Sequence, residues 1–376
     1  MKVAMLGIYG GINRDYNPGN VLIAYYTKKE LMKRREDMII DIFSLDYSLK
    51  DEIEKKTCFS NTPFELEMTF FSNNRRLEIY KNLQDNYDML ILGGDIIIGL
   101  SETFFLDEMI KSKKHPKIVL NAVSTLWRTQ LISDIQKKKI FALAEACDYV
   151  SVREHYVKEL FEDCGVTKKI EIVPDPVLQH KKNEWAISQK VENLLDNIKQ
   201  YNKKIVGVSD CLIKENNMVE ALIKSSLIQE NKVIFFSYSK RYEHSQKGEQ
   251  YKRILGSHCD YILEYLNPWE TYSFIENLDL CIGNAYHCCV AAFTSGVPFI
   301  GIDPSPFVES RHTEIAIQKE KISPYILKAS VVDNDLSGVT LQKYMERAIN
   351  KKPVDEVDLS AERKRIENHF DRICGL

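Results

Sequence analysis

Residues 280–303 read LCIGNAYHCCVAAFTSGVPFIGID. Two short apolar runs, Leu280–Ile282 and Phe299–Ile302, flank a stretch that is rich in small residues. This pattern predicts a buried strand, a tight turn, a helix over Tyr286–Ser295 and a second buried strand. Continuously apolar strands that are joined by a helix are typical of a parallel sheet covered on both faces. The segment therefore indicates a β-α-β unit.

The same alternation of apolar runs and helical patterns recurs along the chain. In the first half it predicts strands at Lys2–Ile8, Met38–Phe43, Met89–Leu92, Ile118–Asn121, Tyr149–Val152 and Ile170–Val173. A polar stretch follows, with a helix expected over Glu184–Lys199. The alternation then starts again, with strands expected at Ile205–Val208, Val233–Ser237, Tyr261–Leu263, Leu280–Ile282 and Phe299–Ile302.

These patterns predict an α/β fold of two Rossmann-like, doubly wound domains that face a cleft. The expected parts are an N-terminal domain over residues 1–176, a linker with a helix over 177–202 and a C-terminal domain over 203–376. The helical pattern at Ala361–Ile373 predicts a last helix that packs back toward the first domain. Ligands of such sheets bind beyond the carboxyl ends of the strands, so candidate site residues should follow strands.

Composition excludes some classes of protein. Of 376 residues, 51 are Lys or Arg and 54 are Asp or Glu, a formal net charge of −3 that gives no general attraction to nucleic acid. No apolar run approaches the ~20 residues of a membrane span, and the N-terminus has no signal-peptide pattern. The nine cysteines are scattered and include no C-x-x-C pair, which indicates reduced thiols and no metal site. We expect a cytoplasmic protein.

Two glycine-rich loops follow expected strands. The first precedes a helix that should begin near its end, where backbone N–H groups and the helix dipole favour an anion or an acceptor group. The second ends a buried strand and permits close approach of a ligand to the backbone. The alternative for both is turn geometry alone. The candidate residues are Gly10, Gly11, Asn17, Gly19 and Asn20 in the first loop, and Gly93, Gly94 and Asp95 in the second.

Arg153 ends the expected strand Tyr149–Val152. An arginine at the carboxyl end of a strand can bind a phosphate or carboxylate with two parallel hydrogen bonds. A surface ion pair with Glu154 or Asp148 is the alternative.

His287 lies in the first turn of the helix expected over Tyr286–Ser295, three residues after Asn284. Backbone N–H groups at this helix start can bind an anion, and a histidine beside a bound anion is suited to acid chemistry. The alternative is a packed histidine without a chemical role.

The chain resembles the polysaccharide pyruvyl transferase family over roughly residues 1–305. The resemblance is carried by the segments Asn17–Asn20, Ile91–Gly94, Ser151–Arg153 with Gly165-Val166, Val173–Pro176, and His287 followed by Ala291–Pro298. It implies a glycosyltransferase-B-like fold. It also implies transfer of pyruvate from phosphoenolpyruvate to two hydroxyls of a sugar, which forms a cyclic ketal.

The chain departs from the family pattern at three places. Ala285 stands where family members usually carry arginine, Asp95 where the glycines usually continue, and Asn20 where the loop usually ends in aspartate. A charge-assisted contact contributes about 1.5–3 kcal/mol, so the missing arginine matters for donor binding. Arg311 and His312, in the loop after the strand that ends near Asp303, are candidates to replace its charge.

The resemblance assigns roles to these residues. His287 is the expected general acid and base, while Arg153, Asn284, Arg311 and His312 bind the donor. The partners are phosphoenolpyruvate and a saccharide, or a lipid- or nucleotide-linked sugar, of a capsule or exopolysaccharide. The N-terminal domain would be the acceptor side and the C-terminal domain the donor side. The reaction requires no metal or cofactor, and it would take place in the cytoplasm, including the inner face of the membrane.

Two alternatives remain open. The same two-domain cleft suits a glycosyltransferase that uses a nucleotide sugar, with Gly296–Asp303 near the nucleotide. Ala285 and Asp95 also fit a non-catalytic saccharide-binding relative.

Overall fold

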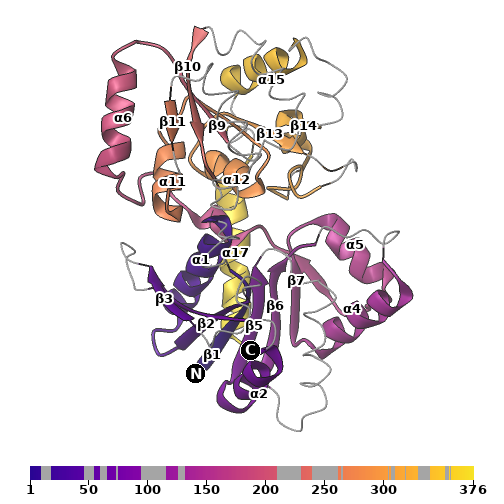
Figure 1. Cartoon of the computed structure of the whole chain (residues 1–376). Helices are drawn as coiled ribbons and strands as arrows, with labels where there is room; N and C mark the ends of the chain where they lie inside the picture. The colour runs from indigo at the N-terminus through magenta and orange to yellow at the C-terminus, as the bar shows by residue number, and fades with distance from the viewer. Residues whose placement is uncertain are drawn as a thin grey trace. The chain divides into compact units, whose positions relative to one another are not determined.

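The computed structural model forms two compact units, each built on its own sheet (Figure 1). The first unit comprises Met1–Val177 and Arg363–Leu376, and the second comprises Leu178–Glu362. The structure describes residues 1–9, 18–45, 55–59, 66–72, 75–94, 116–125, 132–209, 230–238, 261–263, 266–303, 305, 310–317, 319–328, 339–351, 355 and 357–376.

The sheet of unit 1 has the strand order β3-β4-β2-β1-β5-β6-β7-β8 across the described ranges. Every pairing in it is parallel except that of β3 with β4. The strands are β1 (Lys2–Ile8), β2 (Ile39–Leu45), β3 (Lys55–Phe59), β4 (Leu66–Phe71), β5 (Met89–Gly94), β6 (Lys117–Val123), β7 (Tyr149–Val152) and β8 (Ile170–Ile172). Its helices are α1 (Pro18–Arg34), α2 (Arg76–Asn86), α4 (Asp134–Ala146), α5 (His155–Asp163) and most of α17 (Leu359–Cys374).

The sheet of unit 2 has the order β11-β10-β9-β12-β13-β14, and all of its described pairings are parallel. The strands are β9 (Ile205–Ser209), β10 (Lys232–Phe236), β11 (Tyr261–Leu263), β12 (Leu280–Gly283), β13 (Phe299–Asp303) and β14 (Ile326–Lys328). Its helices are η3 (Pro176–Gln179, which begins in unit 1), α6 (Gln189–Lys199), α11 (Pro268–Ile275), α12 (Tyr286–Thr294), α13 (Lys319–Ile322), η5 (Ser323–Tyr325) and α15 (Val339–Asn350).

Local sequence fixes where several helices begin. In α4, the Ser133 side chain accepts a hydrogen bond from the Gln136 backbone N–H, and the Gln136 side chain accepts one from the Ser133 N–H. Asn267 and Glu270 make the same reciprocal pair at the start of α11. Each pair satisfies two backbone donors that the first helical turn leaves without partners. The helix that faces the β12 and β13 strands, α12, ends before Gly296, which has a φ of 70° that favours glycine.

The predicted α/β fold with parallel sheets is confirmed, and each expected strand is present within two residues of its expected bounds. The sequence patterns missed β3 and β4, whose segments carry Lys and Glu among their apolar residues, and β14, which has three residues. The helix expected from Glu184 begins only at Gln189, because Trp185 is buried in a turn before it.

The expected linker and the C-terminal helix group with different units. Residues 178–202 group with unit 2, and Arg363–Leu376 of α17 group with unit 1. Within unit 1, the Arg34 guanidinium at the end of α1 donates to the Asp371 carboxylate at 2.7 Å and to the Glu367 carbonyl at 2.7 Å, both on α17. These hydrogen bonds join the last helix to the first one of the same unit.

Candidate functional site

The start of α12 follows directly from the carboxyl end of β12. A side chain at Gly283, the last residue of β12, would bring a Cβ to 3.1 Å from both the Cys288 Sγ and the Ser209 Cβ, so these neighbours would have to shift. Ala285 is the residue before the helix, and His287 is its second residue, with 2% of its surface exposed. The Tyr286 and His287 rings meet edge to face at 4.9 Å between centroids.

His312 contacts this turn from the segment that follows β13. Its Nε2 lies 2.8 Å from the Asn284 carbonyl oxygen, and because a carbonyl only accepts, Nε2 carries the proton. Its Nδ1 lies 3.5 Å from Asp303 Oδ1. Burial lowers the pKa of His312 to about 4, against the opposing effect of Asp303. The ring is therefore neutral near pH 7 and fixes the Asn284 carbonyl.

Arg311 lies beside the same helix start. Its guanidinium carbon is 5.7 Å from the centroid of the Tyr286 ring, and its side chain is half-buried. Tyr286 adjoins Ala285, the position at which the family usually carries arginine. Within unit 2 the structure thus brings together the predicted catalytic residue, His287, and three predicted donor-binding residues, Asn284, Arg311 and His312.

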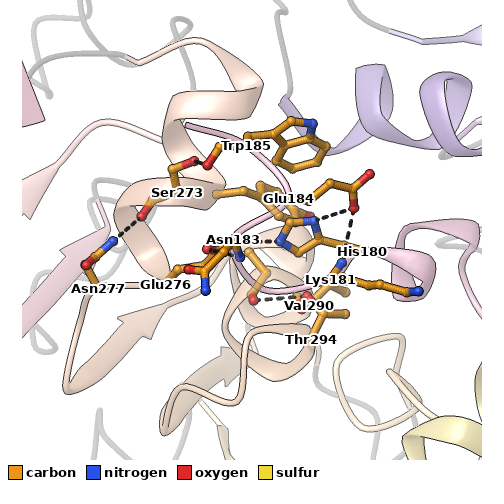
Figure 2. A network of polar contacts seen from close by, with 12 residues as sticks. His180, Lys181, Asn183, Glu184, Trp185, Ser273, Glu276, Asn277, Val290 and Thr294 are labelled. Atoms are coloured by element: carbon orange, nitrogen blue, oxygen red, sulfur yellow. Dashed lines mark hydrogen bonds and ion pairs between the residues drawn. The ribbon is translucent and has the colours of Figure 1, made fainter. Parts of the chain in front are cut away.

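A second group of side chains in unit 2 lies beside α12 (Figure 2). His180 lies between two carboxylates, with Nε2 2.7 Å from Glu276 Oε1 and Nδ1 3.4 Å from Glu184 Oε2. Its ring stacks on Trp185 at 4.5 Å. The Tyr272 ring meets the His180 ring edge to face, and its hydroxyl donates to the His287 carbonyl oxygen at 3.4 Å. Sequence patterns gave no signal for this network, which supports the backbone of His287.

Arg153 lies in unit 1, with 1% of its side chain exposed. Its Nη1 is 2.5 Å from Asp175 Oδ2, and its Nε is 3.6 Å from Glu154 Oε1. The expected alternative was a surface pair, whereas this ion pair is buried and its nearest carboxylate is Asp175. Asp148, the other expected partner, accepts instead from the Lys117 ammonium and the Ile118 N–H.

Asp175 belongs to the Val173–Pro176 segment, so two of the family-like segments contact each other through the Arg153 ion pair. The second Asp175 oxygen accepts from the Val177 N–H at 2.9 Å. Donor binding by Arg153 stays a prediction, and its guanidinium already has carboxylate partners within unit 1.

The two predicted glycine-rich loops lie largely outside the described residues, which omit Gly10, Gly11, Asn17 and Asp95. Gly19 and Asn20 are buried in the first turn of α1, which begins at Pro18. Gly94 ends β5. A Cβ on Gly93 would come within 2.6 Å of the Tyr9 hydroxyl, so the close approach at Gly93 is made by a side chain of the same unit.

Structural comparison defines the class of fold. The chain is similar to the UDP-GlcNAc 2-epimerase of Methanocaldococcus jannaschii, with a TM-score of 0.55 and 12% identity over 94% of each chain. It is similar to S. aureus MnaA solved with UDP, with a TM-score of 0.60 and 10% identity over 100% of this chain and 97% of that one. It is also similar to the E. coli trehalose-6-phosphate structure bound with UDP-2-fluoro glucose. That comparison has a TM-score of 0.59 and 10% identity over 99% of this chain and 98% of that one. The fold is therefore glycosyltransferase-B-like, as predicted.

Sequence comparison defines the family. The family model described as polysaccharide pyruvyl transferase matches residues 17–306. The chain belongs to this family, and it is a transferase whose family acts on a sugar acceptor with a pyruvate donor. No curated protein sequence matches the chain. Within the described ranges, no helix is long and apolar enough to cross a bilayer.

Proposed function

We propose that this protein transfers pyruvate from phosphoenolpyruvate to two hydroxyls of a sugar in a cell-surface polysaccharide or its precursor, and forms a cyclic ketal. One observation carries the proposal. In a chain of this family, His287 and Arg311 both lie against the Tyr286 ring, next to the start of α12. A proton-transfer group and a cation thus accompany the positive end of a helix dipole.

The donor carries a carboxylate and a phosphate, and the groups at the α12 start suit both. The N–H groups of the first turn and the helix dipole favour an anion there. Arg311 supplies a guanidinium that can bind carboxylate or phosphate with two parallel hydrogen bonds. His312 donates a hydrogen bond to the Asn284 carbonyl oxygen beside this helix start. Arg311 thereby takes the place of the arginine that the family usually carries at the position of Ala285.

The reaction begins with a proton from His287 to the methylene carbon of phosphoenolpyruvate, which gives oxocarbenium character at C2. A sugar hydroxyl attacks C2 and forms the first C–O bond. The C2–O bond to phosphate then breaks, and a second hydroxyl forms the second C–O bond of the ketal. Of the two hydroxyl protons, one restores His287 and the other leaves with phosphate. The products are a pyruvate ketal and inorganic phosphate.

For Arg153 the buried contacts favour a supporting role in unit 1. Its charge is already balanced by Asp175 and Glu154, so a donor would have to displace a buried partner. The acceptor side in the N-terminal part of the chain and a cytoplasmic location remain parts of the proposal.

A second candidate is a glycosyltransferase that uses a nucleotide sugar, because two of the similar structures are described with UDP or a UDP-sugar. A non-catalytic saccharide-binding relative is the third. Thermal-shift titration with phosphoenolpyruvate, UDP-sugars and GDP-sugars distinguishes them, since a ligand at 100 times its Kd adds about 2.7 kcal/mol of stability. We expect stabilisation by phosphoenolpyruvate. Stabilisation by a nucleotide sugar alone would overturn the proposal, and stabilisation by neither donor would favour the non-catalytic relative.

A further inference from the structure

The carboxyl ends of three neighbouring strands of unit 2 carry polar side chains that sequence patterns did not single out together. The strands β12, β13 and β14 are adjacent, and they end beside Asn284, at Asp303 and at Lys328. Asp303 and Lys328 are register partners in the parallel pairing of β13 with β14. The pairing therefore places a carboxylate and an ammonium side by side, next to the α12 start.

The Asp303 carboxylate accepts hydrogen bonds from several groups at this edge of the sheet. It is 1% exposed and accepts from the Ser310 hydroxyl at 2.6 Å, from the Ser305 N–H at 2.9 Å and from the Lys328 ammonium. Burial opposes ionisation, yet the charge that His312 carries in the acid range and these donors together hold the pKa of Asp303 below its usual value. Asp303 is therefore an ionised carboxylate, held at the edge where a phosphate group is expected.

The negative charge of Asp303 disfavours binding of an anion nearby, because like charges repel each other. One imidazole ring, that of His312, separates Asp303 from the Asn284 carbonyl. With His312 neutral, the charged groups of this edge include Arg311 and Asp303, and the carboxyl group of Glu314 lies in the same turn as Arg311. Lys328 adds a second cation beside these groups. Asp303 joins Lys328 to His312, because its Oδ2 accepts from the Lys328 ammonium and its Oδ1 lies 3.5 Å from His312 Nδ1.

Lys328 also has access to solvent. Its side chain is 24% exposed, whereas its partner Asp303 is buried. The Asp303 carboxylate thus orients a lysine side chain that is partly exposed at the carboxyl edge of the sheet.

We propose that Lys328, oriented by Asp303, is a second cation of the donor site and binds the phosphate group of the donor beside Arg311. The proposal deepens the proposed function and rests on it for the identity of the donor. Its chemical content is narrower, since it requires only that a phosphate group binds at the joint edge of β13, β14 and α12.

The test compares the variants Lys328→Gln and Lys328→Arg with the control Lys321→Gln. Lys321 is a half-buried lysine on α13 of the same unit, so the control removes the same charge elsewhere. Affinity for inorganic phosphate and for phosphoenolpyruvate is measured by calorimetry at constant ionic strength, together with the Tm. We expect Lys328→Gln to weaken both affinities by about tenfold, the lower end expected for a charged hydrogen bond. Lys328→Arg should retain most of the affinity, and Lys321→Gln should match the parent.

The outcomes separate this proposal from the proposed function. Phosphate binding that depends on Lys328, without binding of phosphoenolpyruvate, would support the site and overturn the pyruvyl donor. Parental affinity of Lys328→Gln for phosphoenolpyruvate, with a lowered Tm, would show that Lys328 only ties β14 to Asp303. If the parent protein binds neither ligand, both proposals fail.

A double variant tests direct contact. If Lys328 acts only by cancelling the Asp303 charge, Lys328→Gln combined with Asp303→Asn regains the parental affinity. We expect the double variant to bind phosphate less tightly than Asp303→Asn alone, because the direct hydrogen bond is lost. Full recovery of affinity in the double variant would overturn direct binding.

Discussion

Each unit has an arginine in the segment that follows one of its strands, and the two arginines differ in burial. Arg153 follows β7 in unit 1, and Arg311 lies beyond β13 in unit 2. In unit 1, Arg153 is buried and bonded to Asp175, so its positive charge is balanced by a carboxylate of the same unit. In unit 2, Arg311 is half-buried over the Tyr286 ring, and Lys328 is partly exposed next to His312. The sequence position of an arginine therefore does not tell whether it binds a ligand, because burial and local carboxylates decide that. From this comparison we expect the donor to bind in unit 2.

The largest effect is expected at His287. His287→Asn should lower turnover by about 10²–10⁴-fold, the usual contribution of general acid and base catalysis, while the Tm and donor affinity stay near parental values. Asparagine keeps a polar side chain of similar size but cannot exchange a proton near neutral pH. Single-turnover rates at saturating phosphoenolpyruvate measure the effect.

Two results would assign His287 another role. A raised KM with normal turnover would indicate donor binding alone. A lowered Tm with normal turnover would indicate packing behind the Gly296 turn.

Arg153 should matter more for stability than Arg311 does. Arg153→Ala leaves the buried Asp175 carboxylate without its guanidinium, and removal of one partner of a buried ion pair typically costs about 3–5 kcal/mol. Urea denaturation of both alanine variants measures the difference in the free energy of unfolding. A loss of donor affinity without a loss of stability in Arg153→Ala would return Arg153 to the donor site.

Arg311 should show the reverse pattern. Arg311→Ala is expected to weaken phosphoenolpyruvate binding by the equivalent of about 1.5–3 kcal/mol, because a charge-assisted contact is lost. Its free energy of unfolding should change less than that of Arg153→Ala, because the Arg311 side chain is half-buried whereas that of Arg153 is buried. Lys321→Ala is the matched control for net charge. Equal affinities of the Arg311 variant and this control would remove Arg311 from the site.

The smallest effect near neutral pH concerns two buried histidines, one in each unit. Burial lowers the pKa of His312 to about 4 and that of His369 to about 3, and His369 bonds to Asn121 at 2.7 Å. The unfolded chain binds a proton at each near pH 6.5, so it binds more protons than the folded state below that pH. Stability should therefore be fully present above about pH 6.5 and be lost as the pH falls toward 4 and then 3.

His369→Gln tests the contribution of unit 1. Glutamine can donate to Asn121 and accept from the Tyr149 hydroxyl, which lies 2.9 Å from His369 Nδ1, but it does not titrate. The variant should lose less stability than the parent between pH 6.5 and 4. An unchanged pH dependence would show that His369 titrates alike in the folded and unfolded states.

Sequence patterns predicted the features that depend on neighbouring residues. Continuous apolar runs gave the strands, and the Gly283 turn placed His287 in the first turn of α12. They did not predict the burial of Arg153, because its partner Asp175 lies 22 residues further along the chain and meets it only through the pairing of β7 with β8. Lys328 was missed for the same reason, since its role depends on the register of β13 with β14.

Hydrogen–deuterium exchange with and without phosphoenolpyruvate tests the central claim, that the donor binds at the start of α12 in unit 2, most directly. It reports each backbone segment separately, so it does not depend on any substitution. The account predicts slower exchange over residues 284–289 and 310–313 when phosphoenolpyruvate is present, and unchanged exchange over residues 151–155. Protection over 151–155 with none over 284–289 would contradict it.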